Sequence, residues 1–330
     1  ELVNVLDTYG AGDAISTHHP ALRGFYDQVI MDLTEENVRE TAKKSDVIMI
    51  QVPSGDVAKW AEIVLAEDCA IIDIGADIRF RDVDVWEKWY GQKHPNEKMT
   101  HEAVYCIPEV MRDLAKGKKL IANPGCYPTA STLGLQPMLK TGHVVENTIV
   151  IDAKSGYTGA GRRPALNKLL TEAENNFCAY ALGGGHRHTP EIEQNIAYIT
   201  GKDLMKPETW QYINFQPHLL PQVRGIEVTI YATCDRDFTN EEVYELYKDF
   251  YKDEPFVKVF PASLPVQTKW VYGTNFCEMT PTFDARTHRL IVSSVIDNIG
   301  KGAAGQAIQN MNLIMGLPET TGLMMPPMYP

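Results

Sequence analysis

The first part of the chain alternates short apolar runs with segments in which apolar residues recur every three or four positions. Four runs have the character of buried strands: 2–6, 46–52, 69–74 and 120–122. Three segments have the periodicity of helices: 35–44, 56–67 and 129–139. Strands that alternate with helices in this way pair in parallel. The pattern therefore predicts an α/β fold with a Rossmann-type, doubly wound parallel sheet.

In the second part of the chain, apolar and polar residues alternate one by one. Six segments are predicted strands: 148–154, 214–218, 225–234, 257–260, 275–280 and 290–296. Thr239 is expected to open a helix over 240–251, and a last helix is expected after residue 297. These elements predict a mainly antiparallel sheet in an α+β domain, which would serve as a platform for substrate and for a partner subunit. The tail up to Pro330 is rich in Met and Pro and is expected to be irregular.

Composition narrows the classes of protein that fit this pattern. Of the 330 residues, 44% are hydrophobic and 22% are charged, as in an ordinary globular protein with room for two domains. The net charge of −12 argues against a nucleic-acid surface. No apolar run would span a bilayer and no secretory signal is recognisable, so we expect a cytoplasmic protein. The six cysteines form no C-x-x-C pair, which indicates neither a zinc knuckle nor a disulfide framework.

One cysteine stands where a strand passes into a helix. Cys126 follows the predicted strand 120–122 through Asn123-Pro-Gly, and Pro128 suits the first position of the next helix. Unpaired N–H groups and the positive end of the helix dipole favour a thiolate over a thiol at this place. We therefore predict that Cys126 is a nucleophile. The alternative is a small, buried hydrophobic side chain.

A second group of reactive side chains lies at Gly185-His-Arg-His-Thr-Pro-Glu-Ile192. In an extended segment, His186 and His188 would face one side and Arg187 the other. Thr189 is predicted to cap the helix that follows. Imidazole titrates near neutrality, so the pair suits acid–base catalysis better than a metal site, for which no third ligand is recognisable.

A glycine-rich loop, Ser155-Gly-Tyr-Thr-Gly-Ala-Gly-Arg162, follows the predicted strand 148–154. Its backbone would approach an anion closely, and Arg162 or Arg163 would neutralise the charge of that anion. The alternative is a flexible connector, which leaves the two arginines unexplained.

Arg79 follows the predicted strand 69–74, at the carboxyl edge of the sheet, where open α/β folds bind ligands. Its guanidinium would bind a substrate carboxylate through two parallel hydrogen bonds. An ion pair between Arg79 and Asp77 is the structural alternative.

The start of the chain is unusual for a doubly wound sheet. Such a sheet begins with a strand, a glycine-rich phosphate turn and a helix, and none of these precedes Glu1. We expect that a first βα unit of roughly 25 to 30 residues is missing, either from the protein or only from the sequence as given. Asp7 would then stand where the fold contacts the adenosine ribose and would favour NAD, since a carboxylate repels a 2′-phosphate. The alternative is that Asp7 only caps its own loop and contacts no cofactor.

Five motifs in the same order resemble those of one enzyme family. They are Asp73-Ile-Gly-Ala-Asp-Ile-Arg-Phe80, Asn123-Pro-Gly-Cys-Tyr-Pro-Thr129, the loop Ser155–Arg162, the segment Gly185–Ile192, and Asp297-Asn-Ile-Gly-Lys-Gly-Ala-Ala-Gly-Gln306. Together they are similar to N-acetyl-gamma-glutamyl-phosphate reductase, a relative of aspartate-semialdehyde dehydrogenase, over nearly the whole chain.

The resemblance implies reduction of N-acetyl-glutamyl phosphate to the semialdehyde, with release of phosphate, in arginine biosynthesis. Cys126 would form a thioester, which accepts hydride readily where a carboxylate does not. His186 would be the base partner of Cys126, and His188 would contact cofactor or substrate. The cofactor implied is NADP, in contrast to the NAD indicated by Asp7.

The resemblance also assigns residues to ligands. The substrate would contact Asn123, Arg79, Arg162, Arg187 and His188. The cofactor would contact Ser155, Gly156, Gly159, Gly161, Asn298 and Lys301, of which the last two would lie near the nicotinamide. Asp7 is a further candidate cofactor contact, from its place in the fold and not from the resemblance. Residues 1–125 and 299–330 would form the dinucleotide-binding domain and 126–298 the catalytic, substrate and dimerisation domain of a dimer or tetramer.

Other functions stay open at this point. The same chemistry on an aspartyl or amino-adipyl substrate is the nearest alternative, although the His-x-His-Thr-Pro-Glu segment argues against the aspartyl enzyme. A cysteine hydrolase or acyltransferase would need no nicotinamide, and the alternation of strands and helices argues against it. A truncated, inactive remnant that acts as a binding protein is the last alternative. We expect neither a nucleic-acid nor a membrane partner.

Overall fold

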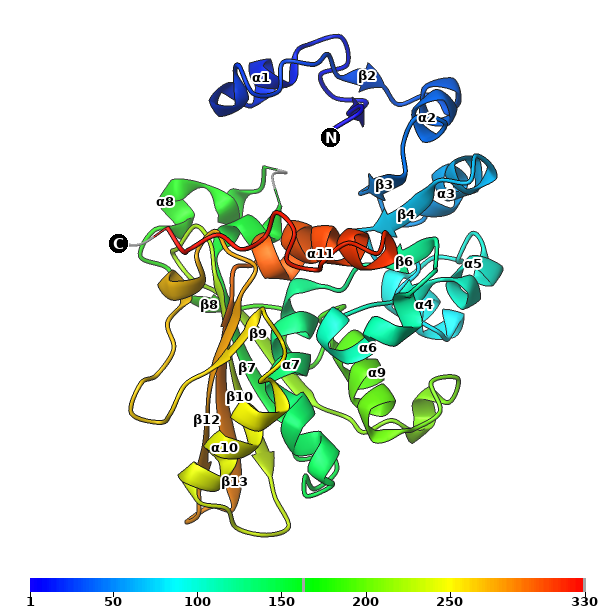
Figure 1. The fold of residues 1–330 in the computed structure, drawn as a ribbon. Coiled ribbons are helices and arrows are strands. Elements are labelled where there is room, and N and C mark those ends of the chain that lie inside the picture. Colours follow the sequence, from blue (N-terminus) through cyan, green and yellow to red (C-terminus); the bar gives the residue numbers. More distant parts are fainter. Residues whose placement is uncertain (162–163, 329–330) are drawn as a thin grey trace.

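The structure is a computed structural model that describes residues 1–161 and 164–328 (Figure 1). Short strands and helices alternate in the first part of the chain, as predicted. The strands are β1 (Leu6–Asp7), β2 (Met31–Asp32), β3 (Val47–Ile50), β4 (Ala70–Asp73), β5 (Val104–Tyr105) and β6 (Leu120–Ala122). The helices are α1 (Ile15–His18), α2 (Glu35–Ala42), α3 (Val57–Ala66), α4 (Val83–Tyr90), α5 (Glu97–Glu102) and α6 (Pro108–Ala115), with a 3₁₀ turn at Pro20–Leu22.

Longer strands follow in the second part of the chain. The strands are β7 (Val150–Ser155), β8 (Cys178–Ala179), β9 (Asn214–Leu219), β10 (Ile226–Thr233), β11 (Val257–Val259), β12 (Cys277–Asp284) and β13 (Arg289–Ile296). The helices are α7 (Cys126–Thr141), α8 (Leu170–Ala173), α9 (Thr189–Thr200), α10 (Asn240–Phe250), a π-helix at Gly300–Ala304, and α11 (Gly305–Ile314). Short 3₁₀ turns lie at Tyr157–Ala160, Leu166–Lys168, Pro207–Thr209 and Thr268–Val271.

The first sheet is parallel, with the strand order β3-β4-β6-β5. All residues of β4 and β6 are buried. Strands covered on both faces consist of continuous apolar runs, which explains why their sequences do not alternate with polar residues. Helices α3 and α11 both pack against β4. The predicted parallel sheet is therefore confirmed.

β1 and β2 form a separate two-stranded parallel sheet, in which Leu6 pairs with Met31. Figure 1 shows this segment, in blue, at one end of the molecule and away from the large sheet. Among the described residues, neither strand pairs with β3. The strand predicted at 2–6 was wrong in extent, because only Leu6 and Asp7 have a paired neighbour.

The second sheet has seven strands in the order β11-β12-β13-β10-β7-β9-β8. The pairs that join β12, β13, β10 and β7 are antiparallel, as predicted, but β11–β12 and β7–β9 are parallel. The β8–β9 pair is antiparallel as well, so the sheet is mainly antiparallel, as predicted, with two parallel pairs that the sequence did not indicate. The chain between β7 and β9 contains α9, and such a long crossover connection is what a parallel pair requires.

Helix α7 joins the two sheets. It follows β6 of the parallel sheet and packs on β10, β12 and β13 of the mixed sheet, with α9 and α10 alongside. Residues 127–139 are all buried. The approach to β10 is close, since a Cβ on Gly134 would lie 2.6 Å from Ile230 Cδ1. The start of α7 therefore lies at the junction of the two halves of the molecule.

Two helix starts differ from the predictions. α7 begins at Cys126, so Pro128 is its third residue and not its first. The proline is tolerated there because the N–H groups of a first turn have no partner within the helix. α9 begins at Thr189, and the residue at its N-cap is His188, whose side chain makes no capping hydrogen bond. The predicted cap at Thr239 is confirmed, with a reciprocal capping box to Glu242.

Candidate functional site around Cys126

The turn that carries Cys126 is held by a buried ion pair. Arg79 Nη1 donates to Glu191 Oε2 at 3.1 Å, and both side chains are buried. Arg79 Nε donates to the carbonyl of Asn123 at 2.9 Å, and Gly125 N donates to Glu191 Oε1 at 2.8 Å. The two charged side chains therefore contact the backbone on both sides of Pro124.

This arrangement changes what was expected of Arg79. The alternative ion pair with Asp77 was wrong, because Arg79 pairs with Glu191 and Asp77 accepts hydrogen bonds from the backbone N–H groups of Gly55 and Val57 instead. Sequence reasoning did not single out Glu191. Glu191 lies in the first turn of α9, two residues after Thr189 and within the segment Gly185–Ile192. An acidic residue at that place was the sequence feature that could have indicated it.

The side chain of Cys126 is partly buried, unlike four of the six cysteines, which are fully buried. Burial raises the pKa of the Cys126 thiol to about 11, although the backbone N–H groups of Tyr127 and Cys126 and the Arg79 guanidinium act to lower it. The prediction that the helix start favours the thiolate is therefore corrected. Desolvation outweighs the amide dipoles at this place, and a base must take the proton.

The two histidines lie together beside this turn. Their ring centroids are 4.8 Å apart, so they face the same region as predicted, although His188 has helical rather than extended backbone angles. A Cβ placed on Gly125 would lie 2.5 Å from His188 Nε2. The residue next to Cys126 thus leaves room for this imidazole only because it is glycine.

Both imidazoles are neutral at pH 7. Burial lowers the pKa of His186 to about 3, with a further contribution from His188. Burial also lowers the pKa of His188 to about 3, together with the nearby Arg79 guanidinium. The neutral form is the one that can accept a proton.

Aromatic rings enclose the histidines, and the sequence had not marked them. Tyr127 packs edge-on against His186 and His188, with centroid separations of 5.7 and 6.0 Å. Tyr180 packs against His186 at 5.6 Å, and its hydroxyl donates to the Tyr127 hydroxyl at 3.3 Å. Tyr127 lies within the Asn123–Thr129 motif. No local sequence pattern indicates Tyr180, which directly follows β8 and is brought to the histidines by the tertiary fold.

Arg187 packs on an aromatic ring from α4. Its guanidinium lies over the ring of Tyr90, 4.6 Å from the centroid, and the residue is exposed. Arg187 therefore stays a candidate for an anionic end of the substrate. Arg162, the other basic residue expected there, lies outside the described residues together with Arg163.

The glycine-rich loop after β7 is fixed by its own protein neighbours. A Cβ on Gly156 would lie 2.8 Å from Arg224 N, and a Cβ on Gly159 would lie 2.9 Å from Ser155 Oγ. Gly161 has a φ of +71°, which favours glycine. Close packing therefore holds Gly156 and Gly159 in place, and the alternative of a flexible connector is not needed to explain these glycines.

Asn298 and Lys301 have different surroundings. Asn298 Oδ1 accepts from Gly225 N at 2.7 Å, and Asn298 Nδ2 donates to Thr158 Oγ1 at 3.0 Å, which attaches the glycine-rich loop to β10. Lys301 is 0% exposed, and its Nζ lies 2.6 Å from Glu109 Oε1. The expected contact between Lys301 and a cofactor is therefore corrected, because its amine is enclosed by protein.

Asp7 ends β1 and is exposed. Its Oδ1 accepts from Tyr9 N at 3.1 Å, as expected if the residue caps its own loop. The other carboxylate oxygen has no hydrogen bond among the described residues and is available to a ligand. Gly10 and Gly12 follow with φ values of +82° and +92° and turn the chain back toward β2.

Some features are absent from the part of the chain that the structure describes. No cluster of three or more His, Cys, Asp or Glu side chains has the arrangement of a metal site. No helix there has the length and apolar character needed to cross a membrane. Surface cavities of about 410 Å³ between α2 and α3 and of about 270 Å³ along α6 are not lined by Cys126 or by either histidine.

Comparison with known families agrees with the division of the chain into two kinds of sheet. Residues 1–118 match the family described as semialdehyde dehydrogenase, NAD binding domain. Residues 126–298 match the family described as semialdehyde dehydrogenase, dimerisation domain. The second match begins at Cys126, the first residue of α7.

Curated relatives give a narrower assignment. The chain is 44% identical over 330 residues to the N-acetyl-gamma-glutamyl-phosphate reductase of Desulforudis audaxviator, which covers 100% of this chain and 92% of that protein. It is 41% identical to the enzyme of the same name from Moorella thermoacetica, with the same coverage. The chain belongs to the N-acetyl-gamma-glutamyl-phosphate reductase family. The resemblance of the five motifs is thereby confirmed at the level of the family.

Solved structures show the same fold in more distant proteins. Aspartate semialdehyde dehydrogenase II from Vibrio cholerae superimposes with a TM-score of 0.68 at 16% identity, over 95% of this chain and 90% of that one. A second aspartate semialdehyde dehydrogenase, from Francisella tularensis, gives a TM-score of 0.64 at 13% identity. The N-acetyl-gamma-glutamyl-phosphate reductase family thus shares the semialdehyde dehydrogenase fold.

Proposed function

We propose that this protein reduces N-acetyl-glutamyl phosphate to N-acetyl-glutamate semialdehyde with release of phosphate, in arginine biosynthesis. The observation that carries the proposal is a cysteine at the first position of a buried helix, with two neutral imidazoles beside it. Membership of the reductase family supports the choice of substrate.

In this proposal Cys126 attacks the acyl phosphate, the C–O bond to phosphate breaks, and a thioester forms. The unpaired backbone N–H groups at the start of α7 are proposed to stabilise the developing oxyanion. Arg187 and Arg162 are proposed to bind the anionic ends of the substrate, and Asn123 is proposed to orient it. Arg79 acts through the turn, because its guanidinium is engaged by Glu191 and by backbone carbonyls.

The residues present fit a nicotinamide cofactor at the strand ends. Asp73 Oδ2 at the end of β4 and His188 Nδ1 are buried without a hydrogen-bond partner among the described residues, and polar groups of a ligand would satisfy them. We propose that Ser155, Gly156, Gly159 and Gly161 border the cofactor, with Asn298 holding their loop. A bound nicotinamide supplies the hydride that reduces the thioester.

The choice between NADP and NAD is a finer part of the proposal. The family resemblance favours NADP, whereas a free carboxylate oxygen on Asp7 favours NAD. Comparing kcat/KM for the two cofactors, in the parent chain and in Asp7→Ser, tests both. If Asp7 repels the 2′-phosphate, the substitution raises efficiency with NADP and leaves NAD unchanged or weaker; equal effects on both cofactors would leave Asp7 only its role as a loop cap.

The two histidines differ as proton acceptors. His186 Nδ1 accepts a hydrogen bond from His188 N at 3.0 Å, so neutral His186 carries its proton on Nε2 and serves there as a donor. His188 Nδ1 has no partner, and His188 Nε2 lies against Gly125. We therefore propose that His188 takes the thiol proton and that His186, the residue the sequence suggested as base, donates a proton to the substrate.

The function is tested by the reverse reaction, the formation of reduced cofactor from N-acetyl-glutamate semialdehyde and phosphate. Cys126→Ser should abolish it, while Cys178→Ser, at the other partly buried cysteine, should retain it. Retained activity in Cys126→Ser would refute the nucleophile. Faster turnover of aspartate semialdehyde or of the longer amino-adipyl semialdehyde would reassign the substrate.

The histidine roles are tested by His188→Gln and His186→Gln. Loss of a general base costs on the order of 10²- to 10⁴-fold in rate. We expect the larger loss in His188→Gln, measured in the acylation burst with acyl phosphate. A larger loss in His186→Gln would return the base to His186.

A further inference from the structure

A π-helix lies next to the proposed nucleophile. In the segment Gly300–Ala304, Gly302 N donates to Asp297 O at 2.9 Å and Ala304 N donates to Ile299 O at 2.8 Å, which are the five-residue hydrogen bonds of a π-helix. Single π-turns are rare, and many occur at functional sites. In the described part of the chain this π-helix lies directly before α11, and its contacts lead to Cys126.

Three contacts join the π-helix and the first turn of α11 to the Asn123–Cys126 turn and to α7. A Cβ on Gly302 would lie 2.8 Å from Cys126 Cβ, so the backbone of Gly302 packs against the Cys126 side chain with no room for a side chain at 302. The carbonyl of Ala303 accepts from Asn123 Nδ2 at 3.1 Å. One turn later, Gln306 Nε2 donates to Thr129 Oγ1 at 2.8 Å. The position of the π-helix therefore sets the position of Cys126.

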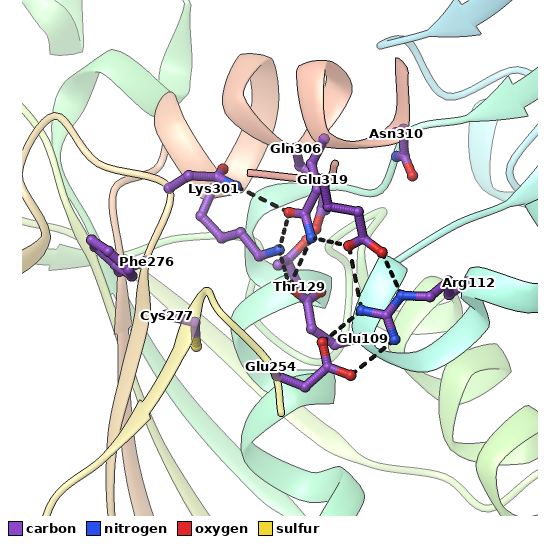
Figure 2. A network of polar contacts seen from close by, with 12 residues as sticks. Glu109, Arg112, Thr129, Glu254, Phe276, Cys277, Lys301, Gln306, Asn310 and Glu319 are labelled. Atoms are coloured by element: carbon purple, nitrogen blue, oxygen red, sulfur yellow. Dashed lines mark hydrogen bonds and ion pairs between the residues drawn. The ribbon is translucent and has the colours of Figure 1, made fainter. Parts of the chain in front are cut away.

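Lys301 fixes the π-helix from its other side. Its Nζ lies 2.6 Å from Glu109 Oε1 and 2.7 Å from Gln309 Oε1, and the side chain is 0% exposed (Figure 2). Burial acts to raise the pKa of Glu109, but the Lys301 ammonium and the hydrogen bonds to Glu109 outweigh it, and the pKa is lowered. The pair is therefore ionised, and each charge depends on the other because neither reaches water.

The pair belongs to a larger network that reaches three other segments. Gln309 Nε2 donates to Glu109 Oε1 at 3.1 Å and to Glu319 Oε2 at 3.0 Å. Arg112 binds Glu319 of the C-terminal segment and, with two hydrogen bonds of 3.0 and 2.6 Å, Glu254 after α10 (Figure 2). Lys301 is thus the fully buried end of a network whose other end, at Arg112, is part-exposed.

We propose that Lys301 is a positioning residue for Cys126: its ion pair with Glu109 holds the π-helix where Gly302 packs against the Cβ of the nucleophile and so sets the position and partial burial of the thiol. This inference rests on the proposed role of Cys126. It gives Lys301 a role in place of the cofactor contact that the sequence suggested, and it explains why a lysine is retained in the interior.

The test compares Lys301→Met with Lys258→Met. Lys258 on β11 pairs with the buried Glu278 on β12 at 3.0 Å. Its substitution therefore also breaks an ion pair, but this pair lies outside the π-helix. Two quantities are measured for each folded variant: kcat and cofactor KM in the reductase assay, and the pH dependence of Cys126 alkylation by iodoacetamide. Alkylation is followed on the Cys126 peptide by mass spectrometry, since the chain has six cysteines.

In Lys301→Met we expect the π-helix to shift and to expose the partly buried thiol further, which moves the midpoint of the alkylation profile from about 11 toward the ordinary value of 9.0. We expect kcat to fall on the order of 10- to 100-fold, because small displacements of a reacting group are costly, with cofactor KM unchanged. The charged or titratable groups that face Cys126, namely Arg79, Glu191, Tyr127, Tyr180 and His188, are left in place, so the shift reports on the π-helix.

Two results would overturn the proposal. An unchanged alkylation midpoint and kcat, with lower thermal stability only, would make Lys301 merely structural. A raised cofactor KM with an unchanged midpoint would restore the cofactor contact. Because alkylation needs no substrate, the profile can be read even if the parent chain lacks reductase activity, so failure of the proposed function and failure of this inference are distinguishable.

Two further variants keep the test available if Lys301→Met does not fold. Lys301→Met/Glu109→Gln removes both charges, so no unpaired charge is left in the interior. Gly302→Ala leaves the ion pair intact and places a Cβ 2.8 Å from Cys126 Cβ. Both should move the alkylation midpoint and lower kcat; a parent-like profile in both would refute the positioning role.

Discussion

Two buried ion pairs lie on either side of the Cys126 turn, and they act on it in different ways. Arg79–Glu191 contacts the turn directly, through the carbonyl of Asn123 and the N–H of Gly125. Lys301–Glu109 contacts it only through the π-helix. The first pair therefore holds the backbone conformation of the turn, whereas the second holds the π-helix that packs against Cys126.

The two sides also differ in their ionisable neighbours. Beside Arg79, burial raises the pKa of Asp73 to about 7, with Asp77 raising it further and Arg79 opposing. Beside Lys301, the pKa of Glu109 is lowered. A carboxyl with a raised pKa stabilises the fold at low pH, and one with a lowered pKa stabilises it at higher pH, so the two sides respond to pH with opposite signs.

The largest expected effect comes from removing Glu191. Glu191→Ala would leave the Arg79 charge buried without a partner and would free Gly125 N and Tyr105 OH, which donate to Glu191 Oε1 at 2.8 and 2.9 Å. Breaking a buried pair in this way costs about 3 to 5 kcal/mol in the free energy of unfolding, measured by urea denaturation.

The matched control for that variant is Glu191→Gln, which keeps one acceptor oxygen, for Gly125 N and Tyr105 OH, but replaces the other oxygen with an NH₂ donor and removes the charge. It should lose less stability than Glu191→Ala and should still lose activity. A loss in Glu191→Ala below about 1 kcal/mol would mean that the direct contacts do not hold the turn.

The next effect depends on pH. Asp73 is buried, and its carboxyl has a folded pKa of about 7 against an ordinary value of 3.8. Its contribution to stability is complete below pH 3.8 and is lost as the pH rises through 7. Asp73→Asn, which stays neutral, should therefore gain stability relative to the parent chain as the pH rises, by about 2 to 4 kcal/mol between pH 4 and pH 8.

Urea denaturation of both chains at several pH values measures this difference. Glu109→Gln supplies the contrast. We expect it to be less stable than the parent chain at neutral pH, and this difference in the free energy of unfolding should shrink as the pH falls below the ordinary carboxyl pKa of 4.5, because the parent then loses the charge of Glu109. A difference between Asp73→Asn and the parent that does not vary with pH would show that Asp73 stays ionised, and the comparison of the two sides would lose its basis.

The smallest effect is expected at the outer end of the Lys301 network. Arg112 is part-exposed, so water compensates for lost contacts with Glu254 and Glu319. Arg112→Ala should cost about 1 kcal/mol and should leave the Cys126 alkylation profile unchanged. A shift of that profile as large as in Lys301→Met would extend the positioning role from the buried pair to the whole network.

Much of the site could be predicted because its signals are local. The strand 120–122, the Asn123-Pro-Gly turn and the following helix are adjacent in sequence, and the structure has them in that order. The two histidines, one residue apart in the sequence, also lie together, although through a turn and not through the extended backbone that the prediction assumed. Helix starts were displaced by up to three residues, because the first turn is defined by contacts with neighbouring elements.

The sequence by itself determined the alternation of strands and helices, the place of Cys126 at a helix start and the family, because each depends on residue order. The tertiary structure decided the partner of Arg79, the enclosure of Lys301 and the mixed direction of the large sheet, since Glu191, Glu109 and the crossover between β7 and β9 come from distant parts of the chain. It also decided the raised pKa of Cys126, because desolvation depends on everything packed around a group and not on its neighbours in sequence.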